Sequence, residues 1–365
     1  MSPIPHGTNR LLIDMPSWLG DCIMATPVLR AARTAIPEAR IVGLVRPGLD
    51  RLLAGCPFVD EWIALDPRGV AGVWRRAKVI RAVRPDAALL LPNSFRAALA
   101  LRLSGTRIRA GYARDARGFL LTHGLAFDKR RERPIATLEY YLRLAKWSLG
   151  VESIDPALHL AVSEEDRAAA ASTLRGVTGP FVVLNPGGNK PGKRWPAEQF
   201  AVVGRALSAR HGVRVVVNGS PGEREIVRDV CAGVPDSINL VERGVTLGAL
   251  KGVIERALLV ITNDTGPRHI AAALGTPLVT LFGPTDPRWT TLPGIRERII
   301  TADPFLPEEL VADDVPERCA IGRIPASDVI HAAEAIMGQV TAGEGRGRPL
   351  SKTRGASEKG GGEAS

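Results

Sequence analysis

Short apolar segments alternate with amphipathic segments of helical length along almost the whole chain, and this alternation constrains the fold more than any other feature. Strands are predicted at 10–15, 40–45, 86–91, 181–185, 213–218, 257–261 and 278–282. Helices are predicted at 21–34, 70–83, 95–103, 136–148, 196–210, 223–230, 247–255, 267–274 and 326–337. Apolar strands separated by helices are typical of parallel sheets that are covered on both faces. The sequence therefore predicts an α/β protein with two doubly wound parallel-sheet domains facing one cleft.

The alternation is interrupted between residues 149 and 179, which places the join of the two domains there. We therefore predict an N-terminal domain at 1–160 and a C-terminal domain at 161–340. From about residue 341 the chain is rich in Gly, Lys, Arg and Ser without periodicity, a composition typical of disorder. Residues 341–365 are accordingly predicted to form a disordered tail.

Composition excludes several classes of protein. No stretch reaches the roughly 18 apolar residues that span a bilayer, and residues 1–10 lack the basic and then apolar pattern of a signal peptide. The four cysteines are far apart and form neither a zinc-binding pattern nor a disulfide framework. We therefore expect a cytoplasmic protein with no metal and no cofactor.

The net charge of +10 is confined to the first half of the chain. Residues 1–160 hold 24 Lys and Arg against 14 Asp and Glu, whereas residues 161–365 hold 24 of each. A solvated surface is the simpler explanation, and an anionic partner is the sharper one. No zinc finger, RNP motif or aromatic-interleaved basic stripe indicates nucleic acid. We therefore expect an anionic acceptor or a membrane surface as the partner. The residues expected to contact this partner are arginines that lie close together in sequence, namely Arg96, Arg107, Arg109, Arg114 and Arg117.

The segment Asn263-Asp264-Thr265-Gly266 follows an apolar strand, and a helix is predicted to start within two residues of it. Free backbone N–H groups and the positive end of a helix then meet at the carboxyl edge of a sheet, where diphosphates bind. His269 lies on the first turn of this helix. The alternative interpretation is ordinary capping by Asp264 or Thr265, with a histidine that is merely packed.

The loop from Gly187 to Arg194 also indicates phosphate. Gly187-Gly188-Asn189-Lys190-Pro191-Gly192-Lys193 matches G-x-x-x-x-G-K, but Arg194 stands where a phosphate-loop NTPase has the Ser or Thr that binds Mg²⁺. We therefore reject an ATPase or kinase and keep phosphate contact, with a flexible Gly/Pro turn as the alternative. No G-x-G-x-x-G follows a strand, which argues against an NAD enzyme.

Asp21 lies between the first strand and the first helix, and it is predicted to face the same cleft from the opposite domain. A carboxylate at a helix start is also a common way to stabilise the helix dipole. A carboxylate facing a cationic diphosphate site nevertheless suits group transfer from a nucleotide. One side activates a hydroxyl group, and the other stabilises the departing phosphate.

Together these motifs resemble glycosyltransferase family nine, the lipopolysaccharide heptosyltransferases. The resemblance is carried in order by Gly20-Asp21, Lys193-Arg194-Trp195-Pro196, Asn263-Asp264-Thr265-Gly266, His269 and Gly283-Pro284-Thr285. Leu91-Pro92-Asn93-Ser94-Phe95-Arg96 and Pro16-Ser17-Trp18 are most similar to the heptosyltransferase II branch. The match covers roughly residues 10–335.

The resemblance implies a GT-B fold of two Rossmann-like domains, with the acceptor in the first and the donor in the second. It implies metal-independent, inverting transfer of a heptose from ADP-heptose to an anionic glycolipid acceptor, the lipopolysaccharide inner core. Asp21 is implied as the general base. The donor-binding residues implied by the resemblance are Lys193, Glu223, Asp264, Thr265, Gly266 and His269. Gly187, Gly188, Arg194 and Ser220 lie in the same loops and are predicted to belong to the same donor site. The implied acceptor-binding residues are Ser17, Asn93, Ser94, Arg96 and Arg114.

The chain departs from the family pattern at two places. Gly187-Gly188-Asn189 lacks the hydroxyl pair that some members place near the diphosphate, and Pro267-Arg268 replaces an apolar-polar pair. Arg268 is expected either to add a phosphate contact or to face solvent. A different nucleotide sugar and a non-catalytic nucleotide- or glycan-binding protein remain the alternative functions. We expect a monomer that can sit peripherally at the inner face of the inner membrane and does not bind nucleic acid.

Overall fold

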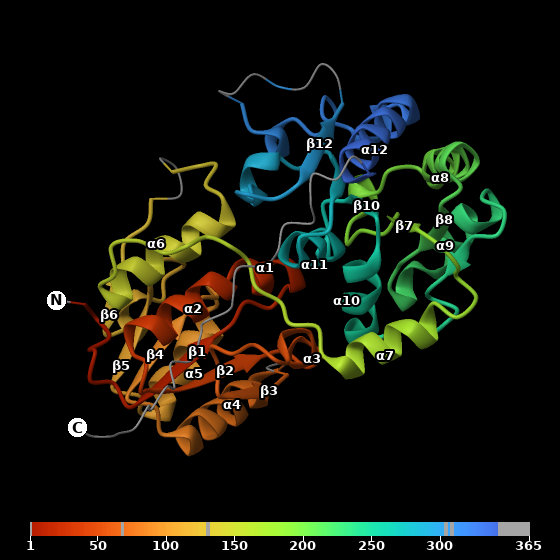
Figure 1. The fold of residues 1–365 in the computed structure, drawn as a ribbon. Helices are drawn as coiled ribbons and strands as arrows, with labels where there is room; N and C mark the ends of the chain where they lie inside the picture. The colour runs from red at the N-terminus through yellow and green to blue at the C-terminus, as the bar shows by residue number, and fades with distance from the viewer. Residues whose placement is uncertain (1, 67–68, 129–131, 303–305, 307–309, 342–365) are drawn as a thin grey trace, which may run out of the picture.

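Two six-stranded parallel sheets organise the chain, as the computed structural model shows (Figure 1). The structure describes residues 2–66, 69–128, 132–302, 306 and 310–341. The first sheet has the order β3-β2-β1-β4-β5-β6, and its strands are β1 (Arg10–Asp14), β2 (Arg40–Val45), β3 (Glu61–Ala64), β4 (Ala87–Leu90), β5 (Ile108–Tyr112) and β6 (His123–Leu125). The second has the order β12-β11-β10-β7-β8-β9, and its strands are β7 (Phe181–Asn185), β8 (Arg214–Val217), β9 (Ile238–Asn239), β10 (Leu259–Asn263), β11 (Leu278–Phe282) and β12 (Glu297–Thr301).

Helices cover both faces of the first sheet because its central strands are apolar on both sides. Leu11 and Ile13 of β1 belong to one buried cluster, and Leu12 between them belongs to another. This alternation follows from the two-residue period of a strand. The helices of this half are α1 (Leu19–Met24), α2 (Thr26–Ala35), α3 (Leu49–Leu53), α4 (Val70–Val83), α5 (Phe95–Ser104) and α6 (Thr137–Leu149), with a 3₁₀ turn η1 (Gly118–Leu120).

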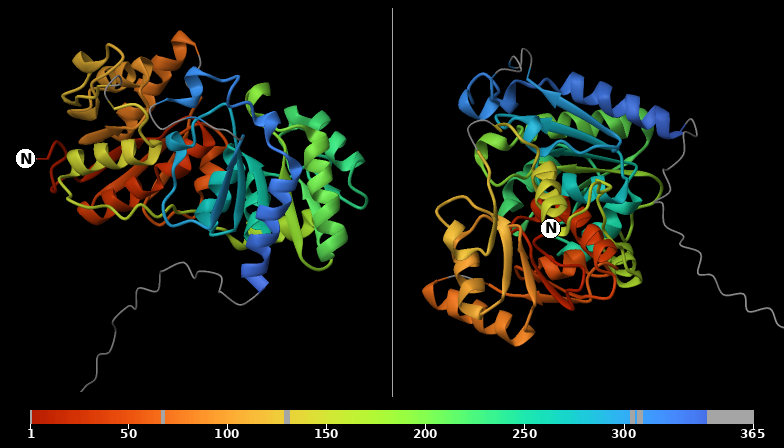
Figure 2. Two further views of the ribbon diagram at one scale, coloured as in Figure 1. Left: turned by 90° about the horizontal axis from the view of Figure 1, so that it is seen from above. Right: turned by 90° about the vertical axis from the view of Figure 1, so that its left-hand side faces the viewer.

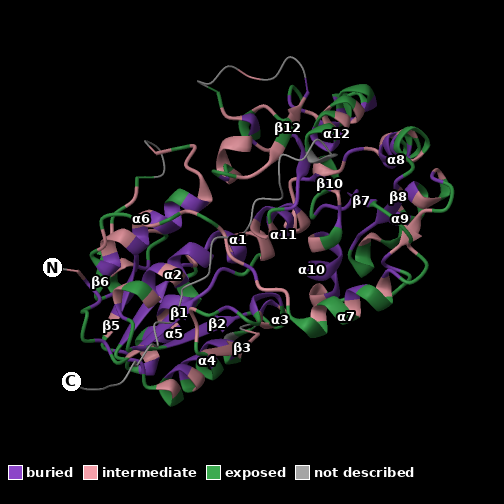
Figure 3. Cartoon of the chain, in the orientation of Figure 1, coloured by how far each residue is buried: buried purple, intermediate pink, exposed green. Residues whose placement is uncertain are grey.

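The second sheet is enclosed in the same way, and buried strands lie between partly exposed helices (Figure 3). Val182 and Leu184 of β7 pack in one cluster, whereas Phe181 and Val183 pack in the other. The helices of this half are α7 (Glu164–Thr173), α8 (Ala197–His211), α9 (Arg224–Ala232), α10 (Leu247–Arg256), α11 (Gly266–Leu274) and α12 (Ala326–Thr341), with 3₁₀ turns η2 (Pro191–Lys193), η3 (Pro221–Glu223), η4 (Pro287–Thr290), η5 (Ala312–Asp314) and η6 (Ile321–Arg323).

The two halves share one buried cluster, which runs from β1 and α2 through α1 and α11 to the facing side of the second sheet. α1 follows β1 and α11 follows β10, so two helices that begin at the carboxyl edges of different sheets meet at the centre of the molecule (Figures 1 and 2). α7 packs on α10, where Lys251 Nζ lies 2.8 Å from an Asp166 carboxylate oxygen. The site described below is built around the meeting of α1 and α11.

The fold class predicted from the sequence is confirmed: both halves are doubly wound parallel sheets. The single helix predicted at 21–34 is wrong, because the chain forms α1 and α2 with Ala25 between them. Pro27 has no N–H to donate to the carbonyl of Ile23, and the Thr26 hydroxyl donates to that carbonyl at 2.7 Å instead. The predicted tail lies outside the described residues, except for Thr341, which ends α12.

Candidate functional site

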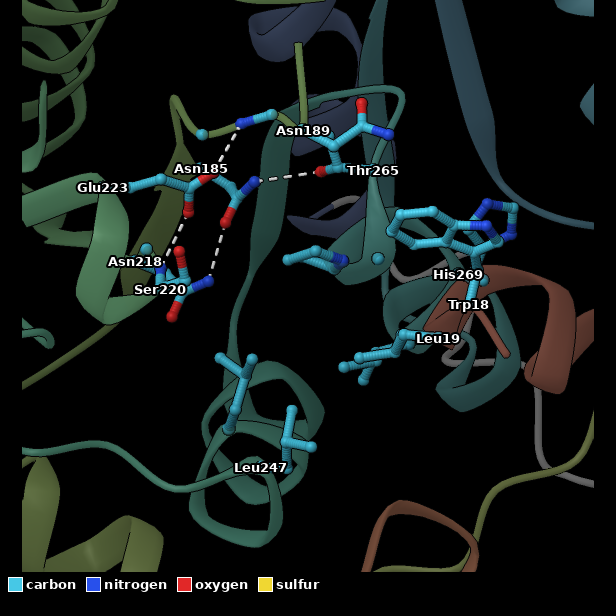
Figure 4. A pocket seen from close by; sticks show the side chains of 18 of the residues that line it. Trp18, Leu19, Asn185, Asn189, Asn218, Ser220, Glu223, Leu247, Thr265 and His269 are labelled. Carbon is cyan, nitrogen blue, oxygen red and sulfur yellow. Dashed lines mark hydrogen bonds between the residues drawn. The ribbon is translucent and has the colours of Figure 1, made fainter. Parts of the chain in front are cut away.

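A cavity of about 620 Å³ lies between the two sheets and is lined by both halves of the chain. α1 and the residue before it contribute Trp18, Leu19, Gly20, Asp21 and Met24. The second half contributes the loops that follow β7, β8 and β10. Figure 4 shows Trp18 and Leu19 on one side of this space, with Asn185, Asn218 and Glu223 on the other. We call this space the central cavity.

The start of α11 is left without a side-chain cap. Thr265 is the N-cap residue, and its side chain accepts no hydrogen bond from the helix. Its hydroxyl instead accepts from Asn185 Nδ2 at 3.1 Å and donates to the Asn263 carbonyl at 3.3 Å. The first N–H groups of a helix have no partner within the helix. Thr265 and Gly266 line the central cavity, so the positive end of α11 is available to an anion there.

The loop after β7 is anchored by two side chains, one from the end of β10 and one from η3. Asn263 Nδ2 donates to the carbonyls of Pro186 and Gly187 at 2.9 and 3.0 Å. The two oxygens of Glu223 accept from the backbone N–H of Gly188 at 2.6 Å and of Ser220 at 2.8 Å. A Cβ on Gly187 would lie 2.4 Å from that carboxylate, so the close approach requires glycine. Glu223 therefore fixes Gly188 and Ser220 at the cavity wall.

Lys193 and Arg194, the two predicted cations, are placed differently. Lys193 lines the central cavity, and its Nζ lies 3.9 Å from an Asp264 carboxylate oxygen. Arg194 is not among the lining residues, and its Nε donates to the Gly188 carbonyl at 2.8 Å. Lys193 is thus the cation placed to meet a ligand, whereas Arg194 braces the glycine loop.

Both expectations for Arg268 are wrong. Its side chain has no exposed surface, and it lines none of the three cavities described here. Its guanidinium donates to both oxygens of Glu297 at 2.7 and 2.9 Å and to Asp264 at 3.2 Å. Burial alone lowers the pKa of a guanidinium, but Glu297 and Asp264 outweigh burial and raise the pKa of Arg268. Arg268 therefore holds the Asp264 carboxylate in place at the start of α11.

Asp21 lies in the first turn of α1 and lines the central cavity. Burial, and then the nearby charge of Asp264, raises the pKa of Asp21 to about 6. The residue before it is held against the other half of the molecule, because a Cβ on Gly20 would lie 2.5 Å from Cδ2 of His269. A partly buried carboxylate with a raised pKa is suited to accept a proton near neutral pH.

His269 is buried and neutral. Its residue exposure is 4%, and burial, together with the charge of Arg268, lowers its pKa to about 3. Within the described part of the chain, its Nδ1 atom has no hydrogen-bond partner. It lines the central cavity, so it can offer a neutral ring but no positive charge to a ligand.

The predicted acceptor residues divide between two smaller cavities, each of about 230 Å³. Asn93 and Arg114 line the side cavity, which also contains Asp21, Tyr140 and, from the second half, Trp289. Ser17, Ser94 and Arg96 line the other cavity. Asp21 lines both the side cavity and the central cavity, and it is the residue that their two sets of lining residues share.

Two of the five arginines predicted to contact an anionic partner are buried and bind other parts of the chain instead. Arg109 is buried and donates to the carbonyls of Leu120 and Thr106. Arg117 has no exposed surface and donates to backbone carbonyls and to Asn93 Oδ1 at 3.1 Å. Neither guanidinium is placed on the surface to meet a partner, in contrast to the exposed Arg96 and Arg107.

Several cavity residues were not predicted from the sequence. Asn185 ends β7, Asn218 follows β8, and Asn218 Nδ2 donates to Asn185 Oδ1 at 2.7 Å. Both line the central cavity, and their signal was a polar residue at the carboxyl end of an apolar strand. Trp18 and Leu247 also line it. Trp18 belongs to the Pro16-Ser17-Trp18 segment that carries the family resemblance, although it was not predicted to bind a ligand, and Leu247 had no comparable signal.

Comparison with known proteins agrees with this geometry. The sequence-family model for glycosyltransferase family 9 (heptosyltransferase) matches residues 73–306 of this chain. Lipopolysaccharide heptosyltransferase 2 of Escherichia coli (strain K12) is 29% identical over 80% of this chain and 87% of the relative. Lipooligosaccharide heptosyltransferase 2 of Haemophilus influenzae is 27% identical over 77% of this chain and 85% of the relative.

Solved structures give the same result. Glycosyl transferase family 9 from Veillonella parvula superposes with a TM-score of 0.79 at 25% identity, over 91% of this chain and 97% of the other. Escherichia coli ADP-heptose lipopolysaccharide heptosyltransferase II superposes with a TM-score of 0.74 at 26% identity, over 90% and 99% of the two chains. Fold and site thus define a GT-B-like glycosyltransferase built from two Rossmann-like domains. The chain belongs to glycosyltransferase family 9, the heptosyltransferases.

Across the described ranges, no helix is both long and apolar enough to cross a membrane. Within the same residues, His, Cys, Asp and Glu side chains form no group of three that could hold a metal ion.

Proposed function

We propose that the protein transfers a heptose from ADP-heptose to an inner-core acceptor of lipopolysaccharide, with inversion at the anomeric carbon. Residues 161–340 hold the nucleotide sugar in the central cavity, and residues 1–160 hold the acceptor. The names of the similar proteins support this proposal, since they include ADP-heptose and lipopolysaccharide heptosyltransferases.

One observation carries the proposal: Asp21 lines both the central cavity and the side cavity. An acceptor sugar in the side cavity has its hydroxyl beside this carboxylate. A donor in the central cavity has its diphosphate toward Lys193 and the start of α11. The anomeric carbon then lies between the attacking oxygen and the leaving phosphate, the arrangement that a direct displacement requires.

The reaction is a single displacement in which every group has a defined role. The acceptor oxygen forms a bond to the anomeric carbon while its proton moves to the carboxylate of Asp21. The bond from the anomeric carbon to the β-phosphate oxygen breaks, and its electron pair leaves with ADP. Lys193 and the N–H groups at Thr265 and Gly266 stabilise the developing charge. Because these groups supply the positive charge, we propose that no metal is required and that EDTA leaves the rate unchanged.

The decisive experiment is mass-spectrometric detection of a heptose moved from ADP-heptose to a core acceptor, with Asp21→Ala as the matched variant. General-base catalysis is typically worth about 10²–10⁴ in rate, so the variant should lose most turnover. It should still bind ADP, because the diphosphate contacts lie on the other half of the chain. Transfer by Asp21→Ala at the wild-type rate would show that Asp21 is not the base.

The choice of nucleotide is tested separately with thermal shifts in ADP, UDP and GDP, since only a ligand that binds the folded state raises the melting temperature. The largest shift is expected with ADP, and Lys193→Ala should reduce it. A larger shift with UDP or GDP would move the assignment to a different sugar donor.

We further propose that the enzyme acts in the cytoplasm as a monomer at the inner face of the inner membrane. The charge excess of residues 1–160 supports this proposal, because a positive surface is attracted to anionic lipid. Cosedimentation with anionic vesicles that weakens as salt rises is the expected result. Equal binding to neutral vesicles would contradict it.

A further inference from the structure

All three tyrosines of the chain lie in its first half, and two of them use their hydroxyl groups within the protein. The Tyr112 hydroxyl donates to the carbonyl of Tyr140 at 2.7 Å. The Tyr140 hydroxyl donates to Asn93 Oδ1 at 2.9 Å and accepts from the Arg114 guanidinium at 3.5 Å. The two rings stack with their centroids 4.0 Å apart. Both hydroxyl groups therefore stabilise the wall of the side cavity, which Tyr140, Asn93 and Arg114 line.

The third tyrosine, Tyr141, has a hydroxyl group that the protein does not use. The residue is only 6% exposed, and it packs in the buried cluster that the two halves share, yet it lines the side cavity. Among the residues that the structure describes, its hydroxyl has no hydrogen-bond partner. Taking a hydroxyl group out of water without a new hydrogen bond is costly. Phenylalanine would fill the same packing position without this cost, so packing alone does not account for the hydroxyl of Tyr141.

The hydroxyl of Tyr141 faces the environment of Asp21. α6, which carries Tyr141, packs on α1, which carries Asp21, and both residues line the side cavity. Burial, and then the charge of Asp21, raises the pKa of Tyr141 well above its ordinary value. The hydroxyl therefore keeps its proton and remains a donor at neutral pH. The Asp21 carboxylate likewise accepts no hydrogen bond from the described residues.

An unpaired donor and an unpaired acceptor in one cavity match a sugar with two neighbouring hydroxyl groups. The hydroxyl that reacts donates to Asp21, and the hydroxyl next to it accepts from Tyr141. A single carboxylate does not distinguish among the chemically similar hydroxyl groups of one sugar, because each of them can donate to it. A second, fixed donor removes this ambiguity, since a site built to hydrogen-bond a substrate hydroxyl discriminates against a substrate that lacks it.

We propose that Tyr141 selects which acceptor hydroxyl is glycosylated, by donating a hydrogen bond to the hydroxyl group next to the one that reacts. This inference rests on the proposed function, because it assumes an acceptor in the side cavity and Asp21 as the base. It assigns the position of the new linkage to a neutral side chain on α6. The arginines near the cavity have no part in this choice, because they donate to anionic groups and hydroxyl groups alike.

The test is titration of synthetic core acceptors into the full-length protein with ADP present, so the readout does not depend on turnover. One acceptor is intact, and each of the others lacks one hydroxyl group of the terminal sugar. Tyr141→Phe removes a single oxygen and should bind the intact acceptor about tenfold more weakly, the loss expected for one hydrogen bond. One deoxy acceptor should bind both proteins equally, because the same contact is already absent. Wild-type affinity of Tyr141→Phe for the intact acceptor, or the same loss with every deoxy acceptor, overturns the proposal.

Tyr112→Phe is the matched control, since it also removes a buried tyrosine hydroxyl, but Tyr112 lines none of the three cavities. It should lower the melting temperature and keep the wild-type preference among the acceptors. Equal loss of this preference in the two variants would reduce the effect to general loosening and overturn the proposal.

Linkage analysis of the product tests the selection itself. Tyr141→Phe should attach heptose at a second hydroxyl group as well as at the wild-type position, and a product with the wild-type linkage alone overturns the proposal. Discrimination among the acceptors in the binding titration, without heptose transfer to any of them, would support the contact of Tyr141 and contradict the proposed function.

Discussion

Gly20 and His269 stand in direct contact across the centre of the molecule, so that a Cβ on residue 20 would lie 2.5 Å from Cδ2 and 2.8 Å from Nε2 of the imidazole. The two residues belong to α1 and α11, the helices that follow β1 and β10. Their contact fixes how closely Asp21, the next residue, approaches the uncapped start of α11. Because Gly20 has no side chain, α1 and α11 can pack this closely, and this close packing sets the position of Asp21 relative to the start of α11.

Gly20→Ala should both destabilise the protein and slow transfer. An inserted methyl group in a packed region costs about 1–3 kcal/mol of unfolding free energy, since neighbours must shift. Urea unfolding and kcat/KM measure the two effects. Gly7→Ala is the control, because nothing lies within 4 Å of a Cβ at that position. In a His269→Ala background the same Gly20→Ala change should cost little, and a full cost there would contradict the contact.

Asp21→Asn should stabilise the protein in a pH-dependent way. The folded-state pKa of Asp21, about 6, is above the ordinary 3.8, so ionisation destabilises the folded state. The stability linked to this group is fully present below about pH 4 and is lost as pH rises through 6. A shift of this size corresponds to about 3 kcal/mol. Because asparagine does not ionise, the variant should match wild type at pH 4 and exceed it at pH 8.

Unfolding free energies from pH 4 to pH 8 measure this difference. A constant difference between the two proteins across that range would contradict the raised pKa. In the wild-type enzyme, the same ionisation should make turnover fall as pH drops below 6, since a protonated carboxyl cannot act as a base.

The parts of the fold and site that could be predicted from the sequence are those that depend on a pattern within one short segment of the chain. β7, β10 and the turn from Asn263 to Gly266 follow from an apolar run that ends in polar residues. β3, β6 and β9 were not predicted, because edge strands are short and only partly buried. β5 was also not predicted, although it is a buried inner strand, and its Arg109 and Gly111 interrupt the apolar run. Which cavity a residue such as Ser94 lines depends on packing between distant segments, and a local pattern does not contain it.

Arg268 shows the same limit at a single position. Its sequence context indicated solvent or phosphate, whereas its partner Glu297 lies on β12, a strand that was not predicted. Thr280 of β11 completes the arrangement by donating to Glu297 at 2.5 Å. A charge is tolerated in this interior only because residues far along the chain satisfy it.

Glu297→Gln should therefore be strongly destabilising. Removal of one partner of a buried ion pair typically costs about 3–5 kcal/mol, because the other charge is left without compensation. The variant should also weaken ADP binding, since Asp264 loses part of its support. Glu242→Gln is the control: its partner is Arg228, both side chains are more than half exposed, and surface pairs contribute about 0–1 kcal/mol. Equal melting temperatures for the two variants would show that the Arg268 pair is not structurally important.

Trp289 should control acceptor binding although it belongs to the second half of the chain. It lines the side cavity beside Asp21, and its indole N–H donates to an Asp313 carboxylate at 2.8 Å. Arg133 from the first half lies over its ring at 5.7 Å and pairs with Asp314 at 2.8 Å. The indole of Trp289 thus forms the wall of the side cavity that comes from the second half of the chain, and it offers an apolar face to a sugar.

Trp289→Ala should raise the acceptor KM about tenfold, which corresponds to about 1.4 kcal/mol, while donor KM and ADP affinity stay near wild type. Trp289→Phe should recover part of the loss, because it keeps an aromatic face without the bond to Asp313. Trp74→Ala serves as the control, since Trp74 is 63% exposed and lines none of the three cavities. Initial rates over a grid of donor and acceptor concentrations separate the two KM values. If the loss appeared in the donor KM instead, the side cavity would not be the acceptor site, and the role of Asp21 as the residue shared by two substrates would have to be abandoned.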